Sequence, residues 1–347
     1  MTYFMDLKGK RIFVGLSGGV DSAVSAKLLI DAGADVVGVF IKGWYPPGMP
    51  CTWASDRRDA MRVAANLHIP FHTLDASAEY KKGVIDYLLA EYKAGRTPNP
   101  DVMCNREVKF GAFYEFAKKN GADFIATGHY ARSEAGKLFR GIDESKDQSY
   151  FLWAVPKHAL AMTLFPLGDK PKTETRILAE RFKLPVAQKR DSQGICFLGS
   201  ISVEDFLKQE FGSEEGKAFD AAGQEVGMHD GALLHTIGER IALRNAAPGP
   251  WYVIWKDIER NVLVVSHEQA GGNDVGGIVL RETNWFSEVG GEPLEAQYRY
   301  HGPRIAGCLN TERDTFVPDA IVPESIASGQ SLVLYRGEEC VGGGIIV

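Results

Sequence analysis

The sequence predicts an α/β protein in which a helix-covered parallel sheet is followed by smaller β-rich units. Short apolar strands alternate with helical patterns over the first part of the chain. After about residue 200, short β-rich runs separated by Gly, Asn and Pro take over. The length of 347 residues corresponds to two or three domains of about 100–200 residues each.

The first part of the chain carries the elements of the parallel sheet. A buried strand is expected at 11–16, and further strands are expected at 36–41, 71–74 and 124–127. Helices are expected at 21–31, 54–67, 78–93 and 105–119. Strands linked by helices of this length form a parallel sheet covered on both faces. Such sheets bind ligands beyond the carboxyl ends of their strands, which is where we expect the site.

The second part predicts small barrels or sandwiches. A helix is expected at 203–211, and strands are expected at 251–255, 262–265, 278–280, 331–335 and 340–347. We place domain boundaries near residues 210 and 275. This division gives a catalytic domain over 1–210, a central β-rich domain over 211–275 and a C-terminal β-barrel over 276–347.

Composition predicts a soluble cytoplasmic protein without a membrane partner. The apolar fraction of 45% supports packed cores, and the longest apolar runs fall far short of the ~20 residues that span a bilayer. The first residues lack the apolar stretch of a signal peptide. The five cysteines include no CxxC pair, which argues against a disulfide framework or a zinc site.

The net charge of −6 conceals an asymmetry along the chain. Residues 1–200 carry 28 Lys and Arg against 22 Asp and Glu, whereas the remainder carries 11 against 23. A negative total does not exclude a nucleic-acid partner, because binding requires only a local basic face. The asymmetry indicates a division of tasks between the domains.

A glycine-rich loop follows the first predicted strand and runs Gly15-Leu16-Ser17-Gly18-Gly19-Val20-Asp21-Ser22. Adjacent glycines let the backbone approach an anion, and the following helix start offers N–H groups to it. The loop lacks the lysine of a Walker A motif. A plain glycine turn with a Ser or Asp N-cap is the alternative, but the strand–SGGVDS–helix order favours a phosphate site.

Two cysteines lie in settings that favour a reactive thiolate. Cys104 is placed just before the helix predicted at 105–119, with Arg106 and Lys109 nearby in sequence, and Cys196 lies in a glycine-flanked loop after a basic pair. Helix N-termini and neighbouring cations lower a thiol pKa. The other three differ: Cys308 and Cys340 have apolar β-like surroundings typical of a core, and a structural role is favoured for Cys51.

The SGGVDS loop resembles that of the PP-loop ATP pyrophosphatases, which have an adenine nucleotide alpha hydrolase-like fold. The resemblance implies cleavage of ATP between the α and β phosphates and adenylation of a carbonyl oxygen, which a nucleophile then attacks. It does not identify the acceptor, since synthetases and RNA-modifying enzymes share this loop.

Four longer motifs narrow the resemblance. They are GRTPNPDVMCNREVKF at 95–110, ATGHY at 126–130, KDQSYFL at 146–152 and DSQGICFLG at 191–199. In this order they are similar to the tRNA-specific 2-thiouridylases of the MnmA type. The similarity continues through segments 298–300, 329–331 and 342–346, and therefore covers nearly the whole chain.

The resemblance implies ATP-dependent thiolation of the wobble uridine in tRNAs for Lys, Glu and Gln. ATP is the expected cosubstrate and Mg²⁺ is expected with it, although the sequence names no metal ligands. Cys196 would carry a persulfide, Cys104 would release the sulfur by forming a transient disulfide with Cys196, and Asp101 would act as the acid or base. The sulfur would come from a relay protein or a cysteine desulfurase. A monomer would suffice.

The resemblance also assigns binding residues. The ATP site would comprise Gly15, Leu16, Ser17, Gly18, Gly19, Val20, Asp21, Ser22, Ile41 and Gly128. The tRNA would be contacted by Asn99, Pro100, Asp101, His129, Lys146, Asp147, Gln148, Arg299, Tyr300 and Gln330. Without the resemblance, a core histidine is the favoured interpretation of His129, a solvated turn explains 146–148, and barrel surface explains 299–300 equally well.

One segment departs from the family. In residues 235–245, Glu239 stands where Gln is usual, and Ile241 and Ala242 replace basic and glycine positions. A tRNA contact there is therefore not assigned. The alternatives are another PP-loop RNA-modifying enzyme such as a lysidine synthetase, an amidotransferase-type synthetase, or an RNA-binding protein without activity. The intact loop and both cysteine motifs disfavour the last.

Overall fold

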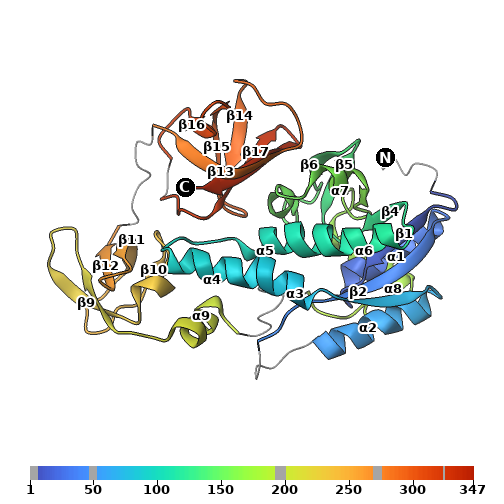
Figure 1. Ribbon diagram of the computed structural model, residues 1–347, viewed down its shortest axis with the longest axis horizontal. Helices are drawn as coiled ribbons and strands as arrows, with labels where there is room; N and C mark the ends of the chain where they lie inside the picture. The colour runs from blue at the N-terminus through green and yellow to red at the C-terminus, as the bar shows by residue number, and fades with distance from the viewer. Residues whose placement is uncertain (1–6, 47–52, 192–200, 269–275, 323–324) are drawn as a thin grey trace.

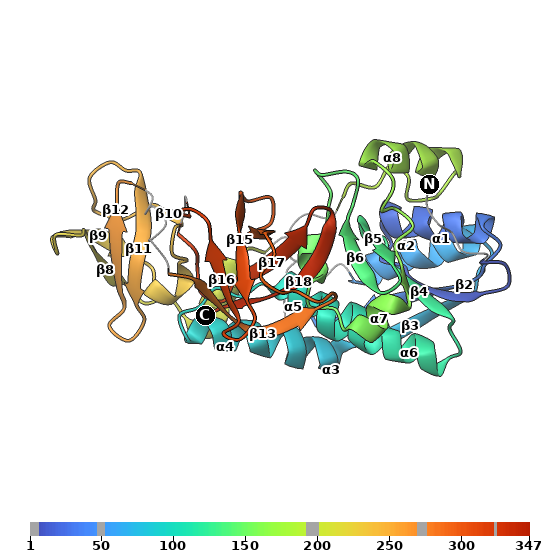
Figure 2. The ribbon, with the colours of Figure 1, turned by 90° about the horizontal axis from the view of Figure 1, so that it is seen from above.

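The computed structural model describes residues 7–46, 53–191, 201–268, 276–322 and 325–347. The molecule is elongated, with an α/β domain at one end and a small β domain at the other (Figure 1). A β-barrel lies above the long helices that connect the two ends, as the view from above also shows (Figure 2).

The α/β domain is built on a parallel sheet with strand order β3-β2-β1-β4-β7. Its strands are β1 (Arg11–Gly15), β2 (Asp35–Lys42), β3 (Phe71–Asp75), β4 (Phe124–Ala126) and β7 (Thr163–Leu164). Ile12 and Val14 belong to one buried cluster and Phe13 to another. The apolar run of β1 is continuous because both faces of the sheet are covered, and the predicted parallel α/β fold is confirmed.

The four helices predicted for this domain are present, one of them with an earlier start, and α7 and α8 were not predicted. They are α1 (Val20–Asp31), α2 (Trp53–Asn66), α3 (Ser77–Tyr80) with η1 (Lys81–Ile85) and α4 (Asp86–Lys93), α5 (Pro100–Met103) with η2 (Cys104–Ala112) and α6 (Phe113–Lys119), α7 (Lys157–Ala161) and α8 (Lys172–Arg181). The helix expected at 105–119 starts at Pro100, because Asn99 caps it by accepting a hydrogen bond from the Val102 N–H at 3.4 Å. Placing Cys104 before this helix was therefore wrong: it lies inside, at the start of a π-helical segment.

The central domain is a five-stranded sheet of order β10-β11-β12-β8-β9. It comprises β8 (Gly216–Phe219), β9 (Glu225–His229), β10 (Arg240–Ile241), β11 (Trp251–Asp257) and β12 (Val262–Ser266), with α9 (Val203–Phe211) before it and η4 (Ala232–Leu234) within it. Its core includes Val253, Leu263 and Val265, which alternate with more exposed residues along their strands.

The C-terminal domain is a closed barrel. Its strands are β13 (Ile278–Trp285), β14 (Leu294–Gln297), β15 (Arg304–Asn310), β16 (Thr315–Pro318), β17 (Ser331–Arg336) and β18 (Glu339–Ile346). Pairing of β13 with both β16 and β18 closes the sheet. The β-barrel predicted from the strand pattern is confirmed.

A hairpin from the α/β domain extends the sheet of the barrel. Strands β5 (Ala131–Glu134) and β6 (Lys137–Arg140) form the hairpin, and Leu138 pairs with Cys340 of β18. The short helix η3 (Ser149–Leu152) follows the hairpin. No local pattern in the sequence predicts this pairing, which joins the barrel to the α/β domain. Within the described ranges, no helix combines the length and apolarity needed to cross a bilayer.

Candidate active site

The glycine-rich loop at residues 15–22, called the phosphate loop below, is held by hydrogen bonds to its own serines. The Ser17 N–H donates to the Ser22 hydroxyl at 3.2 Å, the Gly19 N–H donates to the Ser17 hydroxyl at 3.3 Å, and the Ser22 hydroxyl donates to the Gly19 carbonyl at 3.2 Å. Gly18 has φ of +77°, and a Cβ there would lie 2.3 Å from the Asp56 carbonyl oxygen. The first-turn N–H groups of α1 lack intrahelical acceptors, so this loop can hold phosphate oxygens.

The other residues predicted for ATP lie against this loop. A Cβ on Gly15 would lie 4.0 Å from the Ile41 side chain, which places these two residues side by side at the carboxyl ends of β1 and β2. A Cβ on Gly128 would lie 2.8 Å from the Ser22 nitrogen. The structure therefore brings Ile41, Gly128 and the glycine-rich loop together at the edge expected for a ligand.

Lysines from two later segments contact the same loop. Lys172 donates to both carboxylate oxygens of Asp21, at 2.7 and 2.8 Å, and lies 3.0 Å from Asp191. Lys189 donates to the Gly18 carbonyl at 3.1 Å. Sequence reasoning missed Lys172, since no motif marks it, although the basic character of segment 151–200 is visible in the composition.

Asp191 is the first residue of the motif that contains Cys196, and it is held beside the loop. Lys146 pairs with it at 3.8 Å and Arg176 also contacts it. Attraction to Lys172 and its other cationic neighbours overcomes burial and lowers the pKa of Asp191. Cys196 itself and the rest of its motif up to residue 199 lie outside the described residues.

Cys104 lies on the helix that leads toward the phosphate loop. Its side chain is buried, with 4% of the residue exposed. Burial raises the pKa of Asp101 one turn earlier, and the charge of Lys109 opposes this rise. A carboxyl group that holds its proton more tightly than usual is a stronger base once it is ionised.

Lys109 connects the helix that carries Cys104 to the segment beside the phosphate loop. Its ammonium group lies 3.5 Å from Nε2 of His129, the residue after Gly128. His129 is buried, and its Nδ1 lies 2.7 Å from the Thr127 hydroxyl. Burial, with the nearby Lys109 charge, lowers the pKa of His129 well below its ordinary value. The ring is held in the interior, so its predicted tRNA contact stays a prediction.

Residues near Cys104 reach the barrel through aromatic side chains. The Asn105 amide donates to the Phe151 carbonyl at 2.9 Å. Phe151 packs on Tyr300 of the barrel at a ring distance of 4.5 Å. The Asn99 side chain interacts with the Tyr150 hydroxyl, which also donates to the Ser331 carbonyl at 3.1 Å. Tyr300 is thus connected to Asn99, in the segment predicted to bind the target base, through Tyr150, whose ring lies 6.2 Å from the Tyr300 ring.

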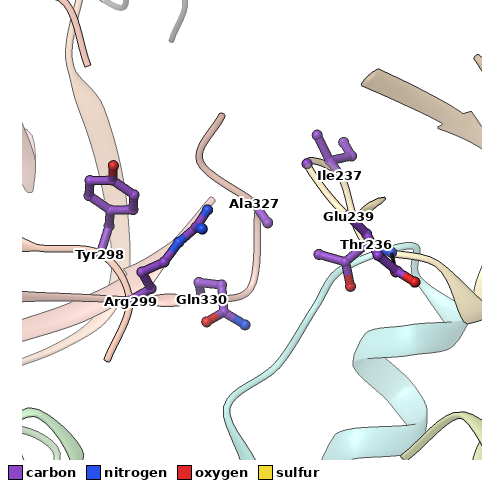
Figure 3. A pocket seen from close by; sticks show the side chains of 8 residues that line it. Thr236, Ile237, Glu239, Tyr298, Arg299, Ala327 and Gln330 are labelled. Atoms are coloured by element: carbon purple, nitrogen blue, oxygen red, sulfur yellow. Dashed lines mark hydrogen bonds between the residues drawn. The ribbon is translucent and has the colours of Figure 1, made fainter. Parts of the chain in front are cut away.

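Gln330 and Arg299 line a pocket between the barrel and the central domain (Figure 3). The Gln330 amide donates to the Thr97 carbonyl at 2.8 Å, two residues before Asn99. Facing them across the pocket are Thr236, Ile237 and Glu239. The Glu239 carboxylate accepts from the Thr236 N–H at 2.8 Å and holds this divergent turn in shape. The turn therefore faces two of the predicted tRNA residues.

The remaining predicted tRNA segment is a tightly bonded turn. Asp147 is buried and accepts hydrogen bonds from the N–H groups of Gly141 and Ser149. Gln148 accepts from the Tyr130 N–H at 3.0 Å, and Lys146 points toward Asp191. This turn connects the phosphate-loop side of the molecule to the barrel side.

The other cysteines play structural parts where they are described. Cys340 is fully buried, burial raises the pKa of its thiol, and the predicted core position is confirmed. Cys308 is only half-buried in β15, so the core position predicted for it was wrong. Cys51 lies outside the described residues. No group of three or more described His, Cys, Asp or Glu side chains is arranged to hold a metal ion.

The parallel sheet, the strand–SGGVDS–helix loop and the two appended β domains define a multidomain PP-loop protein. Family matches follow the chain in the same order: a tRNA methyl transferase HUP domain over residues 10–200, a tRNA methyl transferase PRC-barrel domain over 204–267 and an aminomethyltransferase beta-barrel domain over 275–346.

Full-length relatives give a more specific assignment. A tRNA-specific 2-thiouridylase MnmA from Stutzerimonas stutzeri is 44% identical over 97% of this chain and 94% of its own. The corresponding protein from Salmonella typhimurium is 42% identical over 97% of this chain and 96% of its own. The chain therefore belongs to the tRNA-specific 2-thiouridylase family, and the predicted membership is confirmed.

Among solved structures, a U34-tRNA thiolase NcsA from Methanococcus maripaludis aligns with 59% of this chain and 68% of its own. The identity is 17% and the TM-score is 0.38. This similarity is too distant to support an argument about function. The domain descriptions mention methyl transfer, but the near-complete coverage by the thiouridylases is the stronger indication.

Proposed function

We propose that this chain is an ATP-dependent sulfurtransferase that replaces O2 of the wobble uridine with sulfur in tRNAs for Lys, Glu and Gln. The observation that carries the proposal is the connection between two sites. The Cys104 helix reaches His129 through Lys109, and the adjacent Gly128 touches the phosphate loop at Ser22. A nucleophile and a phosphate site are thus linked by neighbouring residues.

The first step activates the uridine. Backbone N–H groups of the loop and the Ser17 and Ser22 hydroxyls would hold the phosphates of ATP, with Ile41 and Gly15 against the nucleoside. The uridine O2 attacks the α phosphorus, the bond to the β phosphate breaks, and pyrophosphate leaves. Mg²⁺ would accompany ATP and neutralise phosphate charge. The uridine loses its N3 proton as O2 attacks, and the Asp101 carboxylate would accept this proton.

The second step transfers sulfur. The terminal sulfur of a Cys196 persulfide attacks C2, and AMP leaves with the former O2. The Cys104 thiolate then attacks the Cys196 sulfur, so the bond between Cys196 and the transferred sulfur breaks and its electron pair stays with the sulfur on C2. The products are 2-thiouridine and a Cys104–Cys196 disulfide, which thiols of the donor system must reduce.

The tRNA would lie across the face where the catalytic and barrel domains meet. Asn99, Pro100 and Asp101 would surround the target base, since they form the start of the Cys104 helix. Arg299, Tyr300 and Gln330 would contact the anticodon arm from the barrel, and Lys146, Asp147, Gln148 and His129 would act from the α/β side. One chain supplies all these residues, so we propose a monomer.

The proposal also includes a sulfur donor and a cellular location. The persulfide would be delivered by a relay protein or a cysteine desulfurase, and the reaction would take place in the cytoplasm with the tRNA pool. The direct test is release of AMP and pyrophosphate by the purified chain with ATP, tRNA and a persulfide donor. We expect release that requires tRNA and that fails when the wobble uridine is replaced by cytidine. Equal release without tRNA would contradict the proposal.

A further inference from the structure

A second pocket lies on the other side of Tyr300, between the β5–β6 hairpin region and the barrel. Its volume is about 450 Å³, within the ~300–1,000 Å³ typical of small-molecule sites. The lining residues are Arg140, Glu144, Ser145, Asp147, Tyr150, Gln297, Tyr300, His301, Gly302 and Arg304. It therefore lies between two predicted tRNA-binding segments, 146–148 and 299–300.

Arg140 is a buried cation with unused hydrogen-bond donors. Its side chain is 5% exposed, and its Nε and Nη2 atoms have no hydrogen-bond partner among the described residues. The guanidinium stacks on the Tyr335 ring, with Cζ 3.5 Å from the ring centroid. A planar donor group held in this way is pre-organised to bind a ligand with acceptors along one edge.

The carboxylates near Arg140 do not satisfy these donors. Asp147 lies 4.0 Å from Nη1 and Glu295 lies 3.8 Å from Nη2, both beyond hydrogen-bond distance. Asp147 instead accepts hydrogen bonds from Gly141 and Ser149. Burying a guanidinium with unmade hydrogen bonds is costly, so a ligand that supplies acceptors would be stabilised here.

An aromatic stack ends at the mouth of this pocket. The rings of Tyr300 and His301 are stacked at 3.9 Å with an interplanar angle of 23°. Phe151 packs on Tyr300 at 4.5 Å from the side of the α/β domain. His301 is exposed and has φ of +55°, an unfavourable conformation for a residue with a side chain. The chain thus presents an aromatic ring to solvent at the end of a stack that begins beside Asn105.

The charged residues around the pocket favour a nucleobase over a phosphate as the ligand. The lining contains two arginines and two carboxylates, and Glu295 lies between Arg140 and Arg304 at 3.8 Å from each. Such a balance offers no net attraction to an isolated phosphate. A nucleobase is uncharged, has carbonyl or ring-nitrogen acceptors along its edge, and stacks on aromatic rings.

We propose that the pocket lined by Arg140 and His301 binds an unpaired tRNA base next to the target uridine. His301 stacks on the base, and Arg140 donates to acceptors on its edge. This inference rests on the proposed function, because it names a second base that the same RNA must present. It adds Arg140, His301 and Arg304 to the residues predicted from sequence.

The test measures binding of an anticodon stem-loop RNA to the full chain by fluorescence anisotropy. His301→Ala should weaken binding about tenfold, the scale of one lost base stack, and His301→Phe should restore most of it. His68→Ala is the matched control, because His68 is also exposed with φ of +55° and lies in the turn after α2. It should bind as the wild type does.

The second part of the test uses a set of RNAs, each with one abasic nucleotide at a different unpaired position of the loop. At one position next to the target, base removal should weaken wild-type binding about tenfold and add little to the effect of His301→Ala. Arg140→Lys, which keeps the charge but loses the planar fork, should show the same non-additivity. If Arg140→Lys fails to fold, the His301 series decides.

Two results would overturn the proposal. One is equal binding by His301→Ala and His68→Ala, and the other is full additivity of His301→Ala with every abasic position. If either result is obtained while the wild type binds and thiolates the stem-loop, the base-binding pocket is refuted and the proposed function stands. If the wild type neither binds nor thiolates it, the proposed function fails as well.

Discussion

The ammonium group of Lys172 lies 2.7 and 2.8 Å from the two carboxylate oxygens of Asp21 and 3.0 Å from Asp191. Asp21 belongs to the phosphate loop, and Asp191 starts the segment that leads to Cys196. The Lys172 side chain is 12% exposed, so this bridge is shielded from solvent. One lysine therefore connects the phosphate loop to the start of the segment that contains Cys196.

Lys172→Met should impair thiolation by weakening the use of ATP. Without the ammonium group, Asp21 and Asp191 repel each other and the loop loses its placement, for which a loss of about 100-fold in kcat/KM for ATP is expected. Steady-state kinetics with varied ATP measures this loss. Lys170→Met is the control. Lys170 lies close to the start of α8, and the one ion pair described for it joins its ammonium group to Glu174 at 2.7 Å. Equal kinetics for both variants would rule out the bridging role.

Asp101→Asn should inactivate the enzyme and stabilise the fold at neutral pH. Burial raises the pKa of Asp101 from its ordinary value of 3.8, so the folded state holds this proton more tightly than the unfolded chain. Ionisation of Asp101 therefore reduces stability as pH rises from the unfolded pKa through the folded pKa. The Asn side chain of the variant does not ionise, so the variant does not lose this stability as pH rises.

Melting temperatures of both proteins between about pH 4 and about pH 8 check the sign. The advantage of Asp101→Asn should be largest at neutral pH and shrink on acidification, where both side chains are uncharged. An advantage that grows toward acidic pH would show that the sign is wrong.

Glu91→Gln should loosen the contact between the barrel and the α4 helix. Glu91 is buried and accepts from Arg96 at 2.6 and 2.8 Å and from Arg281 of β13 at 2.6 Å. Burial alone would raise its pKa, but these arginines prevail and lower it. Removing the carboxylate leaves two arginines facing each other, for which a loss of about 3 kcal/mol in the free energy of unfolding is expected.

Chemical denaturation measures this loss, and Glu282→Gln serves as its control. The Glu282 side chain is 43% exposed and pairs with Arg106 and Arg281, so its loss should stay below about 1 kcal/mol. Since the pKa of Glu91 is lowered, its contribution is present at neutral pH and is lost as pH falls below the ordinary value of 4.5. Similar losses in the free energy of unfolding for Glu91→Gln and Glu282→Gln would refute the stabilising role of the buried Glu91 carboxylate.

Strong periodicity made the α/β domain predictable from sequence. The runs at 11–16 and 36–41 are apolar on both faces, and the structure contains β1 and β2 there. The β5–β6 hairpin was missed because its strands are short, and its partner β18 lies about 200 residues later in the chain. Local patterns carry no information about a pairing at such a separation.

The candidate site was predictable where motifs are contiguous and hidden where the fold assembles it. The loop at 15–22 and the position of Gly128 against it follow from motif and sheet order. Lys172 and Arg140 belong to no motif, because their contacts with Asp21 and Tyr335 are made between segments far apart in the sequence. The helix start at Pro100 was missed although its signal is local, since Asn99 caps the helix and Pro100 takes the first helical position.

The most direct test of the account is the mass of the wobble nucleoside after incubation of tRNA with the purified chain, ATP and a persulfide donor. We expect the wild type to replace one oxygen of the uridine with sulfur, and Cys104→Ser and Cys196→Ser each to leave it unchanged while still binding ATP. The half-buried Cys308→Ser is the control and should thiolate normally. Full thiolation by either the Cys104 or the Cys196 variant would contradict the persulfide and disulfide mechanism, and an unmodified uridine with the wild type would contradict the function itself.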